Sequence, residues 1–253
     1  MKAVRVRNLI IGEGRPKICV PIVGRTKAEI IEQAKLCLSV EADMMEWRAD
    51  WFEQVEDSDA VQEMLVTLRN IVKEMPVLFT FRTKNEGGER MIERTQYLAL
   101  LEKVLQGGNV DLVDVEVYLD EKITKEIIKF AHEHCVKVLA SNHDFAGTPS
   151  KEEIIHRLCY MQELDADILK IAVMPKNRQD VLTLLAATEE MERKDAKSPL
   201  VTMSMGGLGV ISRCFGEIFG SAITFGAAEK ASAPGQLEVS ELKKILDTIH
   251  KVL

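Results

Sequence analysis

The sequence has no long apolar run, and its cysteines show no recognisable spacing. No stretch approaches the roughly 18 apolar residues that a membrane-spanning helix needs. Met1–Arg7 mixes charges into a short alternating pattern and lacks the apolar centre of a signal peptide. The five cysteines are odd in number and fit no zinc or redox motif. We therefore expect reduced thiols, a cytoplasmic location and no membrane partner.

The charge balance and the length limit the remaining classes. The chain has 33 basic and 40 acidic residues, and this net charge of -7 argues against nucleic acid as the partner. Its 253 residues, 46% of them hydrophobic, suffice for a full core and match the usual length of a single α/β barrel. Since we find no linker, low-complexity tract or repeat, we expect residues 1–253 to form one domain.

Short apolar runs alternate with longer helical patterns along the chain. Val4–Val6 and Leu9–Ile11 flank a polar pair and predict an N-terminal β-hairpin. Eight further runs, several apolar nearly throughout, are typical of parallel strands that are covered on both faces. These predicted strands are Ile18–Val23, Met44–Trp47, Val77–Phe81, Leu112–Val117, Val136–Ala140, Ile168–Val173, Leu200–Met203 and Ala222–Phe225.

Helical periods fill the gaps between these strands. Thr26 and Glu29 form a capping box ahead of the first helix, and Thr148-Pro149 predicts a cap with a first-turn proline before the fifth. Val210–Ile218 predicts a short seventh helix, and the last apolar face runs from Leu242 to Leu253. Eight strand–helix units favour an α/β fold, a (β/α)8 TIM barrel with an N-terminal hairpin. A doubly wound open sheet is the main alternative.

Polar residues gather where the predicted strands end. Active sites of such barrels lie at the C-terminal ends of the strands, so polar groups on six or more strand ends predict a functional cavity. The residues that we expect there are Glu46, Arg48, Arg82, Glu86, Asp114, Glu116, His143, Lys170, Ser204, Arg213, Ser232 and Gln236. The small, breaker-rich segment 231–236 reads either as a loop that closes over a ligand or as an ordinary connection.

Lys170 is the sharpest single feature, because its strand Ile168–Val173 is otherwise apolar. Burial lowers the pKa of a lysine, and a neutral amine attacks carbonyl groups to form a Schiff base. The alternatives are an ion pair with a barrel carboxylate such as Glu116, or an ammonium group that reaches the rim. The local sequence leaves these alternatives open.

His143 follows a predicted strand and could move protons near neutral pH, with Glu86 from another loop orienting it. The other interpretation is a histidine that only caps the strand. His132 and His134 flank Glu133 but do not fit the His-Glu-x-x-His zinc motif, so we expect no metal site there.

Arginines also follow several predicted strands. Arg48, Arg82 and Arg213 could bind carboxylate or hydroxyl groups with their planar forks, or else pair with barrel acids such as Glu46, Asp50 or Asp114. For Arg213 we favour ligand binding, because glycines precede it in a predicted loop.

Taken together, these segments resemble the type I 3-dehydroquinate dehydratases of the shikimate pathway. The resemblance runs from the hairpin to the last helix, and the order of its motifs makes an accidental match very unlikely. The motifs are Glu46-Trp47-Arg48-Ala49-Asp50, Phe79-Thr80-Phe81-Arg82, Glu86-Gly87-Gly88-Glu89, Ser141-Asn142-His143-Asp144-Phe145, Lys170-Ile171-Ala172-Val173-Met174-Pro175, Met203-Ser204-Met205 with Ile211-Ser212-Arg213, and Ser232-Ala233-Pro234-Gly235-Gln236.

The resemblance implies a cofactor-free and metal-free homodimeric lyase that removes water from 3-dehydroquinate by syn elimination, in aromatic amino acid biosynthesis. It implies that Lys170 forms the imine, that His143 moves the proton, that Glu86 orients His143 and that Arg213 meets the substrate carboxylate. The remaining implied substrate contacts are Glu46, Arg48, Arg82, Ser232 and Gln236. One departure is Pro21, where some family members carry a serine.

Two other functions fit parts of the pattern. A class I aldolase acting on a sugar phosphate would use the same lysine, but we find no clear phosphate cradle in the sequence. A non-catalytic ligand-binding barrel is the third hypothesis, and the intact set of Glu86, His143 and Lys170 argues against it.

Overall fold

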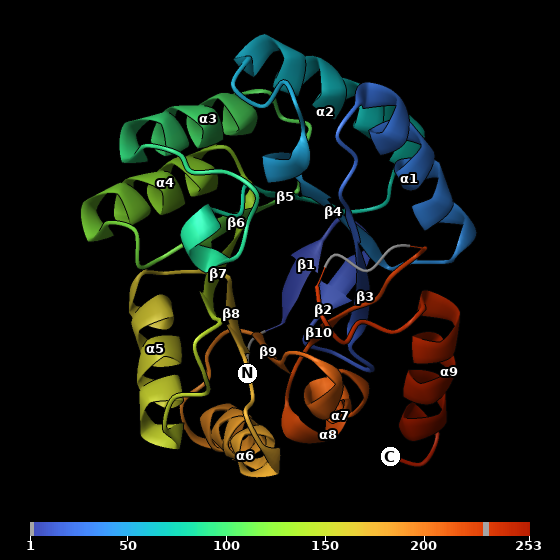
Figure 1. The fold of residues 1–253 in the computed structure, drawn as a ribbon, viewed down its shortest axis with the longest axis vertical. Coiled ribbons are helices and arrows are strands. Elements are labelled where there is room, and N and C mark those ends of the chain that lie inside the picture. Colours follow the sequence, from blue (N-terminus) through green and yellow to red (C-terminus); the bar gives the residue numbers. More distant parts are fainter. Residues whose placement is uncertain (1–2, 230–232) are drawn as a thin grey trace.

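The computed structural model describes residues 3–229 and 233–253 and shows eight parallel strands with helices around them (Figure 1). The strands follow the order β10-β3-β4-β5-β6-β7-β8-β9, so that neighbours in sequence are neighbours in the sheet. This arrangement confirms the predicted barrel. The strands are β3 Lys17–Ile22, β4 Met44–Arg48, β5 Val77–Thr80, β6 Leu112–Glu116, β7 Lys137–Asp144, β8 Ile168–Val173, β9 Leu200–Ser204 and β10 Ile223–Phe225.

The sheet closes on itself, which distinguishes it from the open doubly wound alternative. β10 pairs with β3 in parallel, with Thr224 opposite Ile18. On the other side, β10 is joined to β9 less extensively. A single bridge connects Leu200 of β9 with Ser221, just before β10, and the Ala222 N–H donates to the Leu200 carbonyl at 2.7 Å. The barrel is therefore nearly closed, with its weakest seam between β9 and β10.

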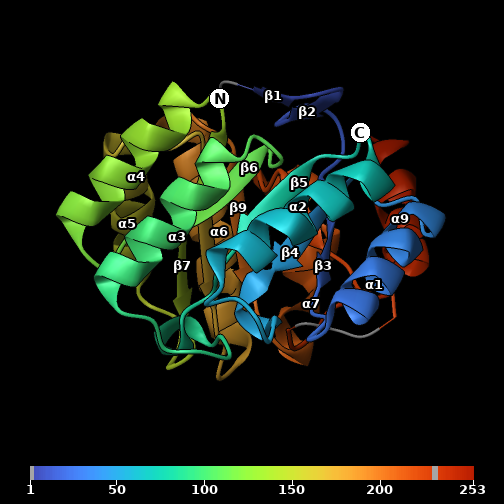
Figure 2. The ribbon, with the colours of Figure 1, turned by 90° about the horizontal axis from the view of Figure 1, so that it is seen from above.

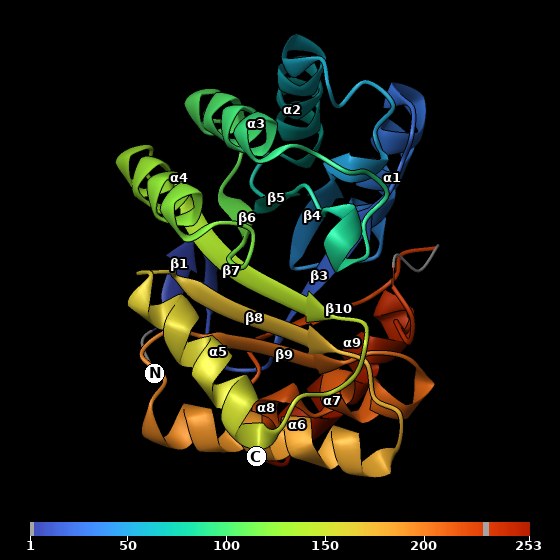
Figure 3. The ribbon, with the colours of Figure 1, turned by 60° about the vertical axis from the view of Figure 1, so that its left-hand side comes forward.

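Helices cover the outside of the barrel (Figures 1 and 3). The capping box of Thr26 and Glu29 begins the first helix as predicted, and that helix buries Ile30, Ala34 and Cys37 against the sheet. No helix in the described ranges is long and apolar enough to cross a membrane. The helices are α1 Lys27–Ser39, α2 Ser58–Val72, α3 Arg94–Gln106, α4 Glu121–Glu133, α5 Lys151–Glu163, α6 Arg178–Lys194, α7 Val210–Cys214, α8 Gly216–Phe219 and α9 Val239–His250, with short 3-10 turns η1 Ala49–Trp51, η2 Lys84–Glu86 and η3 Gly207–Gly209.

Some predicted boundaries were wrong. The N-cap of α5 is Ser150, whose Oγ accepts from the Glu153 N–H, whereas Thr148 donates its hydroxyl to the Met174 carbonyl. The predicted seventh helix is two short helices, α7 and α8, that meet at Phe215. Leu253 lies beyond α9 and is exposed.

The N-terminal hairpin closes one end of the barrel. β1 (Val4–Val6) pairs antiparallel with β2 (Leu9–Ile11), as predicted. Val6 and Ile11 are buried in one apolar cluster with Met44, Leu112 and other residues at the beginnings of the strands. Figure 2 shows the hairpin at one end of the molecule. The strand C-termini at the opposite end are therefore left to form a site.

Candidate active site

A cavity of about 120 Å³ lies where the parallel strands end. It gathers side chains from β4, β7, β8, β9 and β10 and from segments that follow the strands, among them the segment after β5. Eight of the nine residues to which the family resemblance gives a role line it, whereas Ser232 lies outside the described residues. The eight are Glu46, Arg48, Arg82, Glu86, His143, Lys170, Arg213 and Gln236. Asp114, Glu116 and Ser204, which we also expected in the cavity, are buried but do not line it.

Lys170 lies inside the barrel at the middle of β8, where it is only 4% exposed. Its Nζ is 3.7 Å from Asp114 Oδ2 and 4.5 Å from the centre of the Phe225 ring. Burial lowers the pKa of Lys170, while the charges of Glu46 and Asp114 oppose that change. The group is thus a buried amine that loses its proton more readily than a surface lysine.

The carboxylate beside Lys170 is Asp114 and not Glu116, which the sequence had suggested as a partner. Glu116 instead accepts from Arg82 Nη1 at 2.8 Å and from the Thr83 backbone N–H and hydroxyl. Asp114 accepts from Ser141 Oγ at 2.6 Å and from Arg82 Nη2 at 2.7 Å. Because Asp114 shares its charge with Arg82, it only partly offsets the burial of Lys170.

His143 belongs to β7 itself and does not lie beyond its end, since β7 continues to Asp144. Its Nδ1 lies 2.9 Å from Glu86 Oε2, and its backbone N–H donates to the same oxygen at 3.0 Å. Glu86 ends η2, the turn that follows β5. The structure thus contains the contact between the two side chains that the sequence predicted, and the role of His143 in proton transfer stays a prediction.

Burial and nearby cations set the protonation of the imidazole. Burial lowers the pKa of His143 well below its usual value, and the charges of Arg82 and Lys170 lower it further. Burial also raises the pKa of Glu86 to about 8, although the charge of Arg82 opposes this change. When Glu86 is ionised, it accepts from Nδ1–H and leaves a neutral imidazole with a free lone pair on Nε2.

Arg48 and Arg82 line the cavity but are already paired with carboxylates. Arg48 forms two bonds of 2.8 Å with Asp50, and Arg82 binds Asp114 and Glu116. For these two arginines the structure confirms the pairing with barrel acids that the sequence left open. Their forks therefore add positive potential to the cavity while their geometry is fixed by protein acids.

Arg213 differs from the other two arginines. It is 2% exposed, and it makes no ion pair with any carboxylate in residues 3–229 and 233–253. Its Nη2 donates to the Pro234 carbonyl at 3.2 Å, while its Nε is buried without a partner. Burial lowers its pKa to about 10. A buried guanidinium group of this kind has the charge and the free donor that a ligand carboxylate would pair with.

The described end of the loop, 233–236, lies across the cavity. The Pro234 carbonyl accepts from the Gly206 N–H at 3.1 Å as well as from Arg213. Gly235 has a φ of 80°, and a Cβ there would lie 2.4 Å from the Gly206 carbonyl oxygen. Only glycine permits the backbone at 235 to lie this close to Gly206. These contacts of Pro234 and Gly235 therefore hold segment 233–236 over the site.

Several cavity-lining residues were not predicted, because in sequence they resemble core or loop residues. Apolar groups supply much of the wall, and the position of Pro21 in β3, opposite Glu46, carries no hydroxyl. Glu46 itself is buried and accepts from Thr80 Oγ1 at 2.8 Å. The unpredicted lining residues are Gly87, Phe145, Ala172, Met203, Met205, Phe225, Ala233 and Pro234.

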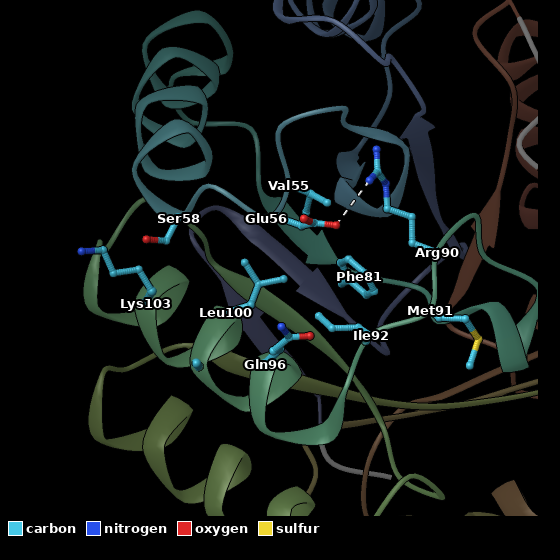
Figure 4. A pocket seen from close by; sticks show the side chains of 11 residues that line it. Val55, Glu56, Ser58, Phe81, Arg90, Met91, Ile92, Gln96, Leu100 and Lys103 are labelled. Carbon is cyan, nitrogen blue, oxygen red and sulfur yellow. Dashed lines mark ion pairs between the residues drawn. The ribbon is translucent and has the colours of Figure 1, made fainter.

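A larger cavity of about 480 Å³ lies outside the barrel, between the start of α2 and the side of α3 (Figure 4). Phe81, Ile92 and Leu100 line it, and Arg90 pairs with Glu56 at 3.8 Å on its edge. It contains none of the predicted site residues.

Among the described residues, no group of three or more His, Cys, Asp or Glu side chains could hold a metal ion. The convergent chemistry thus belongs to the smaller cavity at the strand ends.

Comparison with known proteins agrees with this site. The family model of type I 3-dehydroquinase matches residues 18–252. The 3-dehydroquinate dehydratase of Clostridium novyi is 53% identical over 253 residues, which cover 100% of both chains. A crystal structure of the type I enzyme from Clostridium difficile has a TM-score of 0.97 at 53% identity, covering 100% of this chain and 99% of that one. The enzyme from Geobacillus kaustophilus has a TM-score of 0.96 at 39% identity, covering 99% and 97%. The chain therefore belongs to the type I 3-dehydroquinase family, the Schiff-base hydro-lyases of the shikimate pathway.

Proposed function

We propose that the strand-end cavity converts 3-dehydroquinate to 3-dehydroshikimate by syn elimination of water, through an imine on Lys170. The observation that carries this proposal is one buried cavity that holds an amine, a base and an unpaired guanidinium: Lys170, His143 and Arg213. An amine forms the imine, a base moves the proton, and the guanidinium pairs with the substrate carboxylate.

In the first step the Lys170 amine attacks the ketone carbon, and the resulting carbinolamine loses water to give a protonated imine. The lowered pKa of Lys170 favours the neutral amine that this step requires. Phe225 and Asp114 lie beside Nζ and stabilise positive charge on the nitrogen.

In the second step His143 Nε2 removes a proton from the carbon adjacent to the imine carbon. The electron pair of that C–H bond forms an enamine, because the positively charged imine nitrogen accepts electrons. The imine makes this proton far more acidic than the ketone does, so an imidazole suffices as the base. Glu86 holds Nδ1–H and thereby keeps Nε2 turned toward the substrate.

In the third step the enamine expels the hydroxyl group, which leaves as water with the proton from the His143 imidazolium. Water then hydrolyses the conjugated imine and releases both the enone product and Lys170. Arg213 binds the ring carboxylate, and Glu46, Arg48, Arg82, Ser232 and Gln236 surround the ring and its hydroxyls. Since Arg48 and Arg82 are paired with protein acids, we propose that they mainly determine the electrostatic potential and the shape of the cavity.

We also propose that residues 1–253 act as one catalytic domain, in the cytoplasm and as a homodimer. The continuous barrel and the family match over residues 18–252 support the single domain. The five cysteines are free, in keeping with a reducing compartment. The dimer follows from the family resemblance.

Borohydride trapping tests the proposal. The protein is incubated with 3-dehydroquinate, sodium borohydride is added, and the intact protein and its peptides are weighed by mass spectrometry. We expect a stable adduct on the peptide that carries Lys170. The solved Clostridium difficile relative was obtained with covalently modified comenic acid, which agrees with a reactive centre in this fold. Absence of both an adduct and a rise in enone absorbance would refute the proposed function.

A further inference from the structure

Asn142 connects the proposed catalytic pair to the outside of the barrel. It lies in β7 between Ser141 and His143 and is 8% exposed. Its Nδ2 donates to Glu86 Oε1 at 3.2 Å, and its Oδ1 accepts from Arg157 Nη1 at 3.0 Å. The side chain thus joins Glu86 to a cation on α5.

Arg157 fixes which way the amide of Asn142 points. A guanidinium group only donates hydrogen bonds, so the atom that faces Arg157 is the amide oxygen and the atom that faces Glu86 is the amide nitrogen. A flip of the amide would set oxygen against the carboxylate and nitrogen against the guanidinium. Arg157 itself is held by Glu153 at 2.8 Å and by Asp144 at 3.2 Å.

Glu86 is therefore bound on both carboxylate oxygens. Oε2 accepts from the backbone N–H and the Nδ1 of His143 and, at 3.4 Å, from Arg82 Nη1, and Oε1 accepts from Asn142. Without the Asn142 contact, Oε1 is no longer held, and the last torsion of Glu86, which is soft, is restrained on the Oε2 side alone. Gly87, which directly follows Glu86, contributes no side chain that could replace this restraint.

We propose that Asn142, oriented by Arg157, is a positioning residue that keeps the Glu86 carboxylate turned toward His143. Asn142 does not line the cavity and acts only through Glu86. The inference rests on the proposed function, because it assigns Asn142 a part in the proton transfer that His143 performs.

The charges around Glu86 set the direction of the expected pH effect. Arg82, which follows β5, faces Glu86, as do Glu116 and Asp114 from β6 and His143 from β7. The Asn142 amide is a neutral donor that lowers the pKa of Glu86, against burial and the two acids of β6. Removing the amide leaves the other charges in place and raises that pKa. The Glu86–His143 pair then takes up a proton at a higher pH, so the acid limb of the pH profile of kcat shifts to a higher pH.

The test compares Asn142→Ala and the isosteric Asn142→Asp with the wild type, using kcat, KM, the pH profile of kcat and borohydride trapping. We expect kcat to fall roughly 10-fold to 100-fold, since a hydrogen bond to a charged group is lost. KM and trapping on Lys170 should change little, because imine formation does not use Glu86. The acid limb of the pH profile should shift to a higher pH in both variants. The shift should be larger in Asn142→Asp, because the new carboxylate faces that of Glu86 and repels its negative charge.

Two variants on α5 complete the design. Arg157→Ala should shift the profile in the same direction by a smaller amount, and Arg157→Lys, which keeps a donor, should restore it. Glu153→Gln removes another partner of Arg157 without touching Asn142, and it should keep the wild-type profile.

The inference is overturned if both Asn142 variants keep the wild-type kcat and profile. It is also overturned if trapping and thermal stability fall in proportion to kcat, since that pattern marks a purely structural role. These outcomes require an active wild type. A wild type that neither traps nor dehydrates 3-dehydroquinate would instead remove the proposed function.

Discussion

Replacing Arg213 with Met should make the protein more stable and a much poorer enzyme. Burial lowers the pKa of Arg213 to about 10, a shift that corresponds to on the order of 3 kcal/mol against the charged group in the folded state. The folded pKa lies below the unfolded one, so this penalty is complete at all pH values below about 10 and disappears only as the pH rises from there to the unfolded pKa. Against it stands the lost hydrogen bond to Pro234, about 1 kcal/mol.

The net expectation for Arg213→Met without substrate is a free energy of unfolding raised by about 2 kcal/mol. Catalysis should respond in the opposite direction, because the substrate carboxylate would enter a buried site without its partner. The loss of one member of such a pair costs roughly 2 to 5 kcal/mol, so kcat/KM should fall about 30-fold to 5000-fold.

Urea unfolding at pH 7 and steady-state kinetics measure the two effects. Arg193→Met is a matched control, because Arg193 is half exposed on α6 and pairs with Glu189 one turn away on the same helix. It should change neither quantity appreciably. The reasoning is refuted if Arg213→Met is less stable than the wild type while its kcat/KM is unchanged, since Arg213 would then be a structural cation and not a receptor.

Three further substitutions test the site. Lys170→Met should abolish both turnover and the borohydride adduct, whereas a non-catalytic binding barrel would keep its ligand affinity, as a calorimetric titration with 3-dehydroquinate would show. His143→Ala should still form the trapped imine while kcat falls about 10²-fold to 10⁴-fold; full activity in the enone assay would remove His143 from the mechanism. Gly87→Ala would bring a Cβ within 2.3 Å of the Phe145 ring at a φ of 85° and displace Glu86, so kcat should fall roughly 10-fold to 100-fold. Adding Phe145→Ala should recover part of that loss, and no recovery would contradict the clash.

Much of the fold was predictable because local signals agreed with each other. The capping box of Thr26 and Glu29 fixed the start of α1, and the apolar runs fixed the strands to within a few residues. β7 was the exception, because its last four residues are polar and resemble a loop. They remain in the strand because Ser141 and His143 face the polar interior, while Asn142 and Asp144 bind Arg157 of α5 on the outside. A rule based on apolar residues cannot recognise either arrangement.

The site was predictable as a set of residues but not as a set of contacts. Lys170 stood out as a cation in an apolar strand, yet the acid beside it proved to be Asp114, while Glu116 binds Arg82 and Thr83. Such a choice depends on register and on competition between donors. Asn142 was predicted only as one residue of the Ser141–Phe145 motif, because its contact with Arg157 depends on a helical residue fifteen positions away.

The seam between β9 and β10 has a consequence for the order in which the chain is made. β3 is the first strand of the barrel to be synthesised, and its partner β10 is the last. The two strands pair from Lys17 and Ile223 onward. Until then β3 and β9 are the open edges of an unfinished sheet, which can pair with other chains. A nascent chain that ends after β9 contains Lys170 and His143 but lacks Arg213 and the last strand. Synthesis thus reaches Arg213, the proposed partner of the substrate carboxylate, only after Lys170, the proposed nucleophile. An unfinished chain therefore carries the lysine without the group that we propose selects the substrate.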